Sequence, residues 1–199
     1  MLLRRRMFRN SGGSPAYQKI EYLENTSSCF IDTGFSPNQD NFRCVVKVER
    51  NNYDIDRYIL NVNSSIINLC SIVWRGGNSY WRYKGTSSTE SLAPGTYVLE
   101  LGNPSKINGV EFSINGNKSF IGNTEHLTLF ARVNSDNPSG TSFLVGKIYY
   151  VQMYYGDTLV MNLVPVRIDT TGYMYDTVSG QLFGNAGTGD FTLGPDITE

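Results

Sequence analysis

Apolar and polar residues alternate along much of this chain with a period of two, which is the pattern of a β-strand with one buried face. The clearest example lies between Gly146 and Phe183, where two alternating segments flank the dipeptide Gly156-Asp157. Such a dipeptide suits a two-residue turn with positive φ at the glycine, so this stretch predicts a β-hairpin. The side chains that the parity places inside are Tyr149, Val151, Met153, Leu159, Met161 and Leu163.

The rest of the chain repeats this pattern in short segments separated by turn formers. Residues 42 to 50 alternate in the same way, Gly76-Gly77 predicts a second hairpin turn, and Asn115-Gly116 predicts a third, with residues 118 to 121 returning as a strand. In all we expect about twelve strands and little helix. The fold class that this pattern predicts is an all-β, two-sheet antiparallel jelly-roll sandwich.

Two stretches also carry a resemblance to a known family. The segment GKIYYVQMYYGDTLVMNLVPVR with the later MYDTVSGQLFGNAGTGDF, and the opening YQKIEYLENTSSCFIDTGFSP, resemble the ends of concanavalin A-like (laminin G-like) domains. Such domains recur in bacteriophage structural proteins and in surface proteins of gut bacteria. The resemblance implies the same jelly roll and a structural role for Asp176, whose carboxylate would accept backbone N–H groups in the turn that reaches Gly180.

The composition divides the chain into an arm, residues 1 to 16, and one domain, residues 17 to 199. The arm combines four arginines with the apolar residues Leu2, Leu3, Met7 and Phe8 and ends in a Gly/Ser-rich spacer. We interpret it as a docking segment for another protein; the alternative is a disordered basic tail. Its docking residues would be Leu2, Leu3, Arg4, Arg5, Arg6, Met7, Phe8 and Arg9.

The net charge of −1 conceals an uneven distribution. Without the four arginines of the arm, 13 basic residues face 18 acidic ones, which leaves the body at about −5. A nucleic-acid-binding body would need a basic stripe, so we expect none. The sequence contains no apolar run long enough for a membrane span or a signal-peptide core, and we therefore expect no membrane association.

Candidate catalytic and metal-binding residues are few. Cys29, Cys44 and Cys70 lack zinc-site spacing and are expected to be free, buried thiols, so we predict no cofactor. Asp54, Asp56 and Asp136 could offer oxygen ligands to Ca²⁺, but no D-x-D-x-D-G series is present and solvated loop acids are the better interpretation. The paired acids E-x-D-x-x-E of related glucanases are missing, Glu111 has no partner acid at suitable spacing, and His126 is the only histidine. The sequence therefore predicts a protein that is not an enzyme.

The best candidate for ligand binding is the segment WRGGNSYWRYKG, residues 74 to 85. Because Trp81 and Tyr83 share one parity and Tyr80 and Arg82 the other, one face keeps an aromatic ring or an arginine exposed whichever face is buried. Aromatic rings and Arg or Asn donors are the groups that bind sugars; the alternative is that the aromatics only pack. The candidate ligand-binding residues are Trp74, Arg75, Tyr80, Trp81, Arg82 and Tyr83.

The resemblance and the arm lead to two functional hypotheses. The first is a structural component of a bacteriophage particle, on the virion surface, docked by its arm, displaying a lectin-like domain and able to form homo-oligomers. The second is a free-standing or cell-surface bacterial carbohydrate-binding module, and a glycoside hydrolase is the remote alternative. The arm and the missing signal peptide favour the first.

Overall fold

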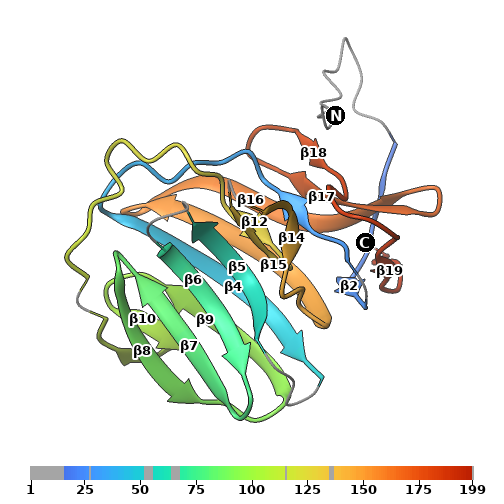
Figure 1. Ribbon diagram of the computed structural model, residues 1–199. Coiled ribbons are helices and arrows are strands. Elements are labelled where there is room, and N and C mark those ends of the chain that lie inside the picture. The colour runs from blue at the N-terminus through green and yellow to red at the C-terminus, as the bar shows by residue number, and fades with distance from the viewer. Residues whose placement is uncertain are drawn as a thin grey trace.

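The computed structural model describes residues 16–26, 28–51, 56–63, 68–114, 116–134 and 137–198, and in these ranges the chain forms β-strands joined by turns and loops, with no helix (Figure 1). Within these ranges there is no helix that could cross a membrane. The arm, and with it the docking residues Leu2 to Arg9, lies outside the described residues, as do Asp54, Asn115 and Asp136.

The strands form two large antiparallel sheets and one small hairpin. The eleven-stranded sheet has the order β11 (Val110–Phe112), β10 (Ser105–Ile107), β9 (Gly95–Leu101), β4 (Phe42–Arg50), β15 (Gly146–Tyr155), β16 (Thr158–Ile168), β17 (Thr171–Asp176) and β18 (Leu182–Phe183). Three short strands join it: β1 (Gln18–Lys19) beside β16, β2 (Leu23–Asn25) beside β15, and β19 (Thr192–Leu193) beside β2. The six-stranded sheet has the order β3 (Ile31–Asp32), β12 (Thr128–Leu129), β5 (Arg57–Asn63), β6 (Asn68–Arg75), β7 (Asn78–Tyr83) and β8 (Thr86–Ser91). The hairpin consists of β13 (Arg132–Asn134) and β14 (Asn137–Thr141).

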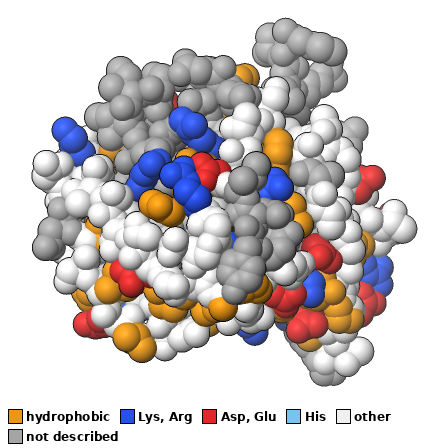
Figure 2. Space-filling model, turned by 60° about the horizontal axis from the view of Figure 1, so that its bottom comes forward, with side chains coloured by type: hydrophobic (Ala, Val, Ile, Leu, Met, Phe, Trp, Pro, Cys, Tyr) orange, Lys and Arg blue, Asp and Glu red, His pale blue; other side chains and the backbone are white. Residues whose placement is uncertain are grey.

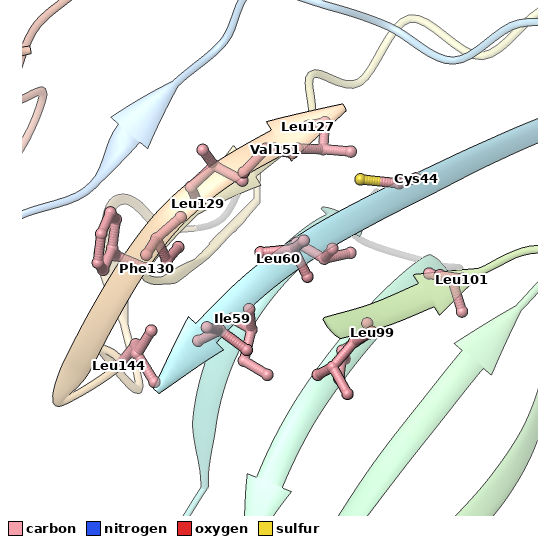
Figure 3. Packing of buried hydrophobic residues seen from close by; sticks show 14 of the residues in the cluster. Cys44, Ile59, Leu60, Leu99, Leu101, Leu127, Leu129, Phe130, Leu144 and Val151 are labelled. Atoms are coloured by element: carbon pink, nitrogen blue, oxygen red, sulfur yellow. The ribbon is translucent and has the colours of Figure 1, made fainter. Parts of the chain in front are cut away.

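The two sheets pack face to face and bury one hydrophobic core between them, so the predicted sandwich is confirmed. On β4 the alternation is direct: Cys44, Val46 and Val48 are fully buried, while the residues between them face away from the core. Leu99 and Val151 of the large sheet meet Leu60 and Leu129 of the small sheet in the same cluster (Figure 3). Burying such rows of apolar surface is the main stabilisation of the fold. All three cysteines are buried free thiols, as predicted.

The hairpin of β15 and β16 exists as predicted, but two of its six inward-facing residues were assigned to the wrong face. Val151, Met153, Met161 and Leu163 are buried. A β-bulge between Ile148 and Tyr150 shifts the register on β4, and the Tyr149 side chain turns to the outer face, where its hydroxyl donates to Glu49 Oε2 at 2.7 Å.

A second bulge turns Leu159 outward. The register on β16 shifts between Met153 and Tyr154, so that Leu159 lies opposite Tyr154 and is 36% exposed. Each bulge adds one residue to a strand, and one residue is enough to exchange the two faces.

Asn115 of the predicted Asn115-Gly116 turn lies outside the described residues, but the strand predicted to return over residues 118 to 121 is not formed. The turn in this region lies at Asn108-Gly109, between β10 and β11, where both residues have positive φ (49° and 83°). Gly116 lies where a side chain would clash: a Cβ there would be far too close to the Tyr83 carbonyl oxygen and to Lys84 Cβ. Glycine therefore permits a close approach to the end of β7.

The structural role expected for Asp176 is confirmed. Its buried carboxylate accepts backbone N–H groups of Asn162 (2.8 Å), Val178 (3.1 Å) and Ser179 (3.1 Å), and the Ser179 hydroxyl. Gly180 closes the turn by donating its N–H to the Asp176 carbonyl at 2.8 Å. The carboxylate thus fixes the end of β17 to β16.

Candidate functional site

Strands β6 and β7 form the hairpin that the sequence singled out, with Gly76-Gly77 as its turn. Three of its six candidate residues belong to the core: Trp74, Trp81 and Tyr83 are 1%, 0% and 2% exposed. The Trp81 indole N–H donates to Ser79 Oγ at 2.8 Å, and the Tyr83 hydroxyl donates to the Phe42 carbonyl at 2.5 Å. Trp74, Trp81 and Tyr83 are therefore packing residues, and their assignment to a ligand-binding surface is corrected.

The other three candidates, Arg75, Tyr80 and Arg82, lie together on the outer face of the six-stranded sheet. Tyr80 pairs across the strands with Val73, and the Arg75 guanidinium lies over the Tyr80 ring, 4.8 Å from its centroid. Arg75 forms a bidentate ion pair with Asp56. The positive charge of Arg82 also lowers the pKa of Asp56, by a smaller amount. Hydrogen bonds from Arg75 are the main cause that lowers the pKa of Asp56, so this carboxyl is ionised at neutral pH.

A row of polar side chains crosses the same face. Strand register places one residue of each of the six strands in this row, in the order Asp32, Thr128, Asn61, Ser71, Arg82 and Ser87. Sequence reasoning found only Arg82 in it, because its neighbours come from segments far apart in the chain. The row contains donors and acceptors but no apolar side chain.

The middle of the row is covered, and its two ends are accessible. Asn61 and Ser71 are fully buried, and the Asn61 amide donates to the carbonyl of Val133 in β13 at 3.1 Å. Asn61 Oδ1 and Ser71 Oγ have no hydrogen-bond partner among the described residues. Arg82 is half-buried and Ser87 exposed, which makes the β7–β8 end the open part of the row.

Together, Asp56, Arg75, Tyr80 and Arg82 form what we call the Tyr80 cluster. It combines one aromatic ring, two guanidinium groups and a single carboxylate, and it is therefore positive overall. Within the described residues Arg82 makes no hydrogen bond or ion pair of its own, so its donors are available to a ligand. The space-filling view shows basic side chains gathered around an acidic one on one face of the molecule (Figure 2).

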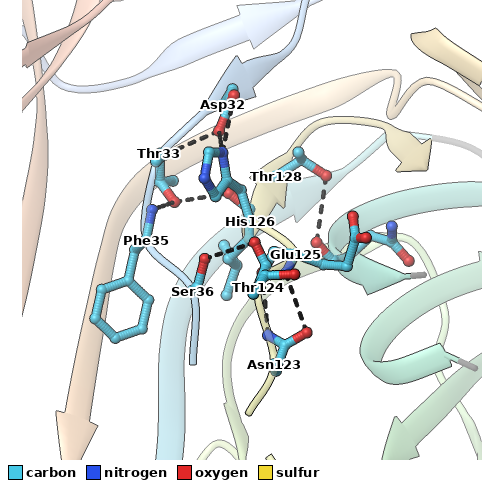
Figure 4. A network of polar contacts seen from close by, with 12 residues as sticks. Asp32, Thr33, Phe35, Ser36, Asn123, Thr124, Glu125, His126 and Thr128 are labelled. Carbon is cyan, nitrogen blue, oxygen red and sulfur yellow. Dashed lines mark hydrogen bonds and ion pairs between the residues drawn. The ribbon is translucent and has the colours of Figure 1, made fainter. Parts of the chain in front are cut away.

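The only histidine, His126, faces an acid at the far end of the row. His126 Nδ1 lies 3.0 Å from Asp32 Oδ1, and Asp32 also accepts the Gly34 N–H at 2.8 Å (Figure 4). The hydroxyl of Ser36 donates instead to the carbonyl of Thr124 at 3.0 Å. In the described part of the chain the pair therefore lacks an activated nucleophile, and His126 is a satisfied, half-exposed histidine.

Metal-ligating groups do not gather on this face. Of the three acids considered for Ca²⁺, Asp56 is described, and its carboxylate is occupied by Arg75. Over the described ranges, no group of three or more His, Cys, Asp or Glu side chains could hold a metal ion.

Comparison with known proteins supports the fold. No known family model matches the sequence, and no curated protein shows significant sequence similarity to it. The structure is similar to that of a protein of Bacteroides ovatus ATCC 8483 described as a putative carbohydrate binding protein, with a TM-score of 0.62 and 10% sequence identity. The match covers 90% of this chain and 62% of that chain, so this chain spans less than two thirds of the neighbour's length. At this identity the likeness shows a shared β-sandwich fold.

Proposed function

We propose that this chain is a non-enzymatic glycan-binding module, displayed on a virus particle to which its N-terminal arm docks it. The observation that carries the binding function is the Tyr80 cluster, in which an aromatic ring on an open sheet face is flanked by Arg75 and Arg82. Aromatic faces pack against the C–H surfaces of sugar rings, and guanidinium groups donate to hydroxyls. The structural neighbour described as a putative carbohydrate binding protein agrees with this proposal.

The charge of the cluster narrows the ligand class. Two arginines face one carboxylate, and Asp56 forms its ion pair with Arg75, while Arg82 acts on Asp56 only through its charge. An available guanidinium beside an aromatic ring favours a sugar that carries a carboxylate, such as a uronic or sialic acid, because the hydrogen bonds to it are charge-assisted. Binding of such a ligand should weaken as the salt concentration rises.

A glycan array tests the binding site. We expect the Tyr80→Ala and Arg82→Gln variants to lose binding to acidic glycans while their melting temperatures stay close to that of the parent protein. Tyr150→Ala is the matched control, because Tyr150 is a half-buried tyrosine on the outer face of the opposite sheet. Equal binding by all three variants, or loss only in Tyr150→Ala, would contradict the assignment.

Binding without hydrolysis is the second part of the proposal. The Tyr80 cluster holds one acid, Asp56, whereas glycoside hydrolysis uses two that flank the scissile bond. Purified protein incubated with acidic and neutral glycans should therefore release no reducing ends. Release that a single carboxylate substitution abolishes would identify a hydrolase.

Display on a particle rests on the sequence of residues 1 to 9, which contains four arginines among apolar side chains. Such a segment is suited to fold onto an acidic, grooved partner. Mass spectrometry of purified virions should find this chain as a component. Finding it only in bacterial surface fractions would favour a cell-surface carbohydrate-binding module instead.

A further inference from the structure

A pocket of about 560 Å³ lies at the end of the sandwich where β4 begins and β9 ends. Its volume is within the range of about 300–1,000 Å³ that small-molecule sites occupy. Four segments distant in sequence contribute to it: residues 40–43, Tyr83, residues 100–106 and residues 156–157.

Three neighbours hold the Arg43 side chain in place, and together they leave some of its N–H donors unused. Its guanidinium carbon lies 3.8 Å from the centroid of the Tyr154 ring, and its Nε donates to the Gly156 carbonyl at 3.3 Å. Its Nη1 lies 3.5 Å from Glu100 Oε1, with the two side chains 29% and 20% exposed. A guanidinium fixed by stacking and by a backbone acceptor is pre-organised, so little conformational entropy is lost when it binds a ligand.

Other lining residues have hydrogen-bonding groups that are unused. Within the described residues, the Asp157 carboxylate and the Asn103 amide have no hydrogen-bond or ion-pair partner. Lys106 is paired only loosely, with Nζ 3.3 Å from Glu111 Oε1. Asp40, in contrast, is already occupied by the Ser119 hydroxyl, the Phe120 N–H and Lys84.

The charges of the lining point to a neutral ligand. Three acids (Asp40, Glu100 and Asp157) face two bases (Arg43 and Lys106), so an anion would meet net repulsion. A metal ion is equally disfavoured, because the described acids form no cluster that could hold one. Hydroxyl groups both donate and accept, and neighbouring hydroxyls of a sugar ring can bridge a guanidinium on one side and a carboxylate or an amide on the other.

We propose that this pocket binds the ring of an uncharged saccharide, as a second site that shares no residue with the Tyr80 cluster. The proposal rests on the proposed glycan-binding function in general, but it differs in place and in ligand class. The Tyr80 cluster is positive and favours an acidic sugar, whereas the pocket is slightly negative and excludes one.

NMR titration of the full chain tests the pocket. The probes are the methyl glycosides of glucose, galactose, mannose and N-acetylglucosamine, with N-acetylneuraminic acid as the charged comparison. At least one neutral glycoside should shift the backbone amides of Asn103, Lys106 and Asp157 in a saturable way, and N-acetylneuraminic acid should leave them unchanged. Failure of every neutral glycoside to shift these amides would overturn the proposal.

Two nearly isosteric variants make the test specific. Asp157→Asn and Glu100→Gln each remove a charged acceptor and should weaken binding of the neutral glycoside about tenfold or more. Asp190→Asn is the matched control, since Asp190 is exposed and lies outside the pocket. Unchanged affinity in both pocket variants would also overturn the proposal.

The Tyr80→Ala variant separates the two sites. Pocket shifts that persist in Tyr80→Ala support an independent second site. Pocket shifts that disappear in that variant, despite an unchanged fold, contradict it. If the parent protein binds neutral glycosides but no acidic glycan, the proposed function of the Tyr80 cluster fails and the pocket stands. If it binds acidic glycans but no neutral glycoside, the pocket fails and the Tyr80 cluster stands.

Discussion

Among single residues, Asp176 shows how one buried carboxylate can fix a turn. Its carboxylate is 1% exposed and accepts three backbone N–H groups and one hydroxyl from the turn and from β16. Sequence reasoning identified its role because the segment MYDTVSG places an acid just before a turn that ends in glycine. A local hydrogen-bonding pattern of this kind depends on neighbours in sequence, and such patterns can be predicted.

Asp176→Ala should lower the free energy of unfolding by about 2–4 kcal/mol, because it leaves several buried N–H groups unpaired. Urea denaturation at neutral pH measures this change. Asp190→Ala is the control: Asp190 belongs to the same C-terminal region but is exposed, and its substitution should have little effect. Equal stability of the two variants would show that Asp176 is not needed for the turn.

The residues of the Tyr80 cluster were only half predictable. Parity separated Tyr80 and Arg82 from Trp81 and Tyr83, but aromatic rings on both faces of β7 left open which face is buried. The answer depends on β6, where Cys70 and Ile72 pair with Tyr83 and Trp81 and carry that face into the core. Asp56 was considered as a loop acid or a Ca²⁺ ligand, and its pairing with Arg75 depends on the approach of β5 to β6, which the sequence does not show.

At the scale of elements, turns and strands were predicted better than their registers. Gly76-Gly77 and Gly156-Asp157 each join two adjacent strands as predicted. The bulges at Tyr149 and Val160 could not be read from the sequence, because an alternating pattern looks the same on either side of an inserted residue. Asn115-Gly116 misled the prediction for a related reason: its glycine serves a contact with Tyr83 and Lys84, more than thirty positions away.

The two leucines of β16 offer a paired test of this register. Leu163 is fully buried, and Leu163→Ala should cost about 2–5 kcal/mol of unfolding free energy through lost burial and a cavity. Leu159 is 36% exposed, and Leu159→Ala should cost less than about 1 kcal/mol. The same residue exchange on one strand thus reports the bulge directly, and similar losses from both variants, measured by urea denaturation, would contradict the shifted register.

At the scale of the whole molecule, the sandwich followed from composition, periodicity and the resemblance of the two ends of the chain to concanavalin A-like domains. Alternating strands with polar outer faces need a second sheet to bury their inner faces, and two antiparallel sheets satisfy that need. The functional surfaces did not follow in the same way. The polar row joins Asp32 to Ser87 across six strands, and the pocket joins four segments, so both depend on strand order.

The arm provides the last test of the whole molecule, because it separates folding from docking. Tyr17 stacks on Tyr175 with ring centroids 4.6 Å apart, and Gln18 and Lys19 pair with Arg167 and Val166 of β16. The sandwich therefore begins at Tyr17, and deletion of residues 1 to 13 should leave the melting temperature nearly unchanged.

The same deletion should abolish incorporation of the chain into the particle, because the segment removed holds all four arginines and their apolar neighbours. A full-length control with Arg4, Arg5, Arg6 and Arg9 changed to Gln keeps the apolar anchors. It should bind more weakly and with little dependence on salt, since charge-assisted contacts are screened and apolar ones are not. Comparing the three chains in purified particles by mass spectrometry measures docking. Normal incorporation of the truncated chain would show that the sandwich itself carries the docking surface, and the arm would lose its proposed function.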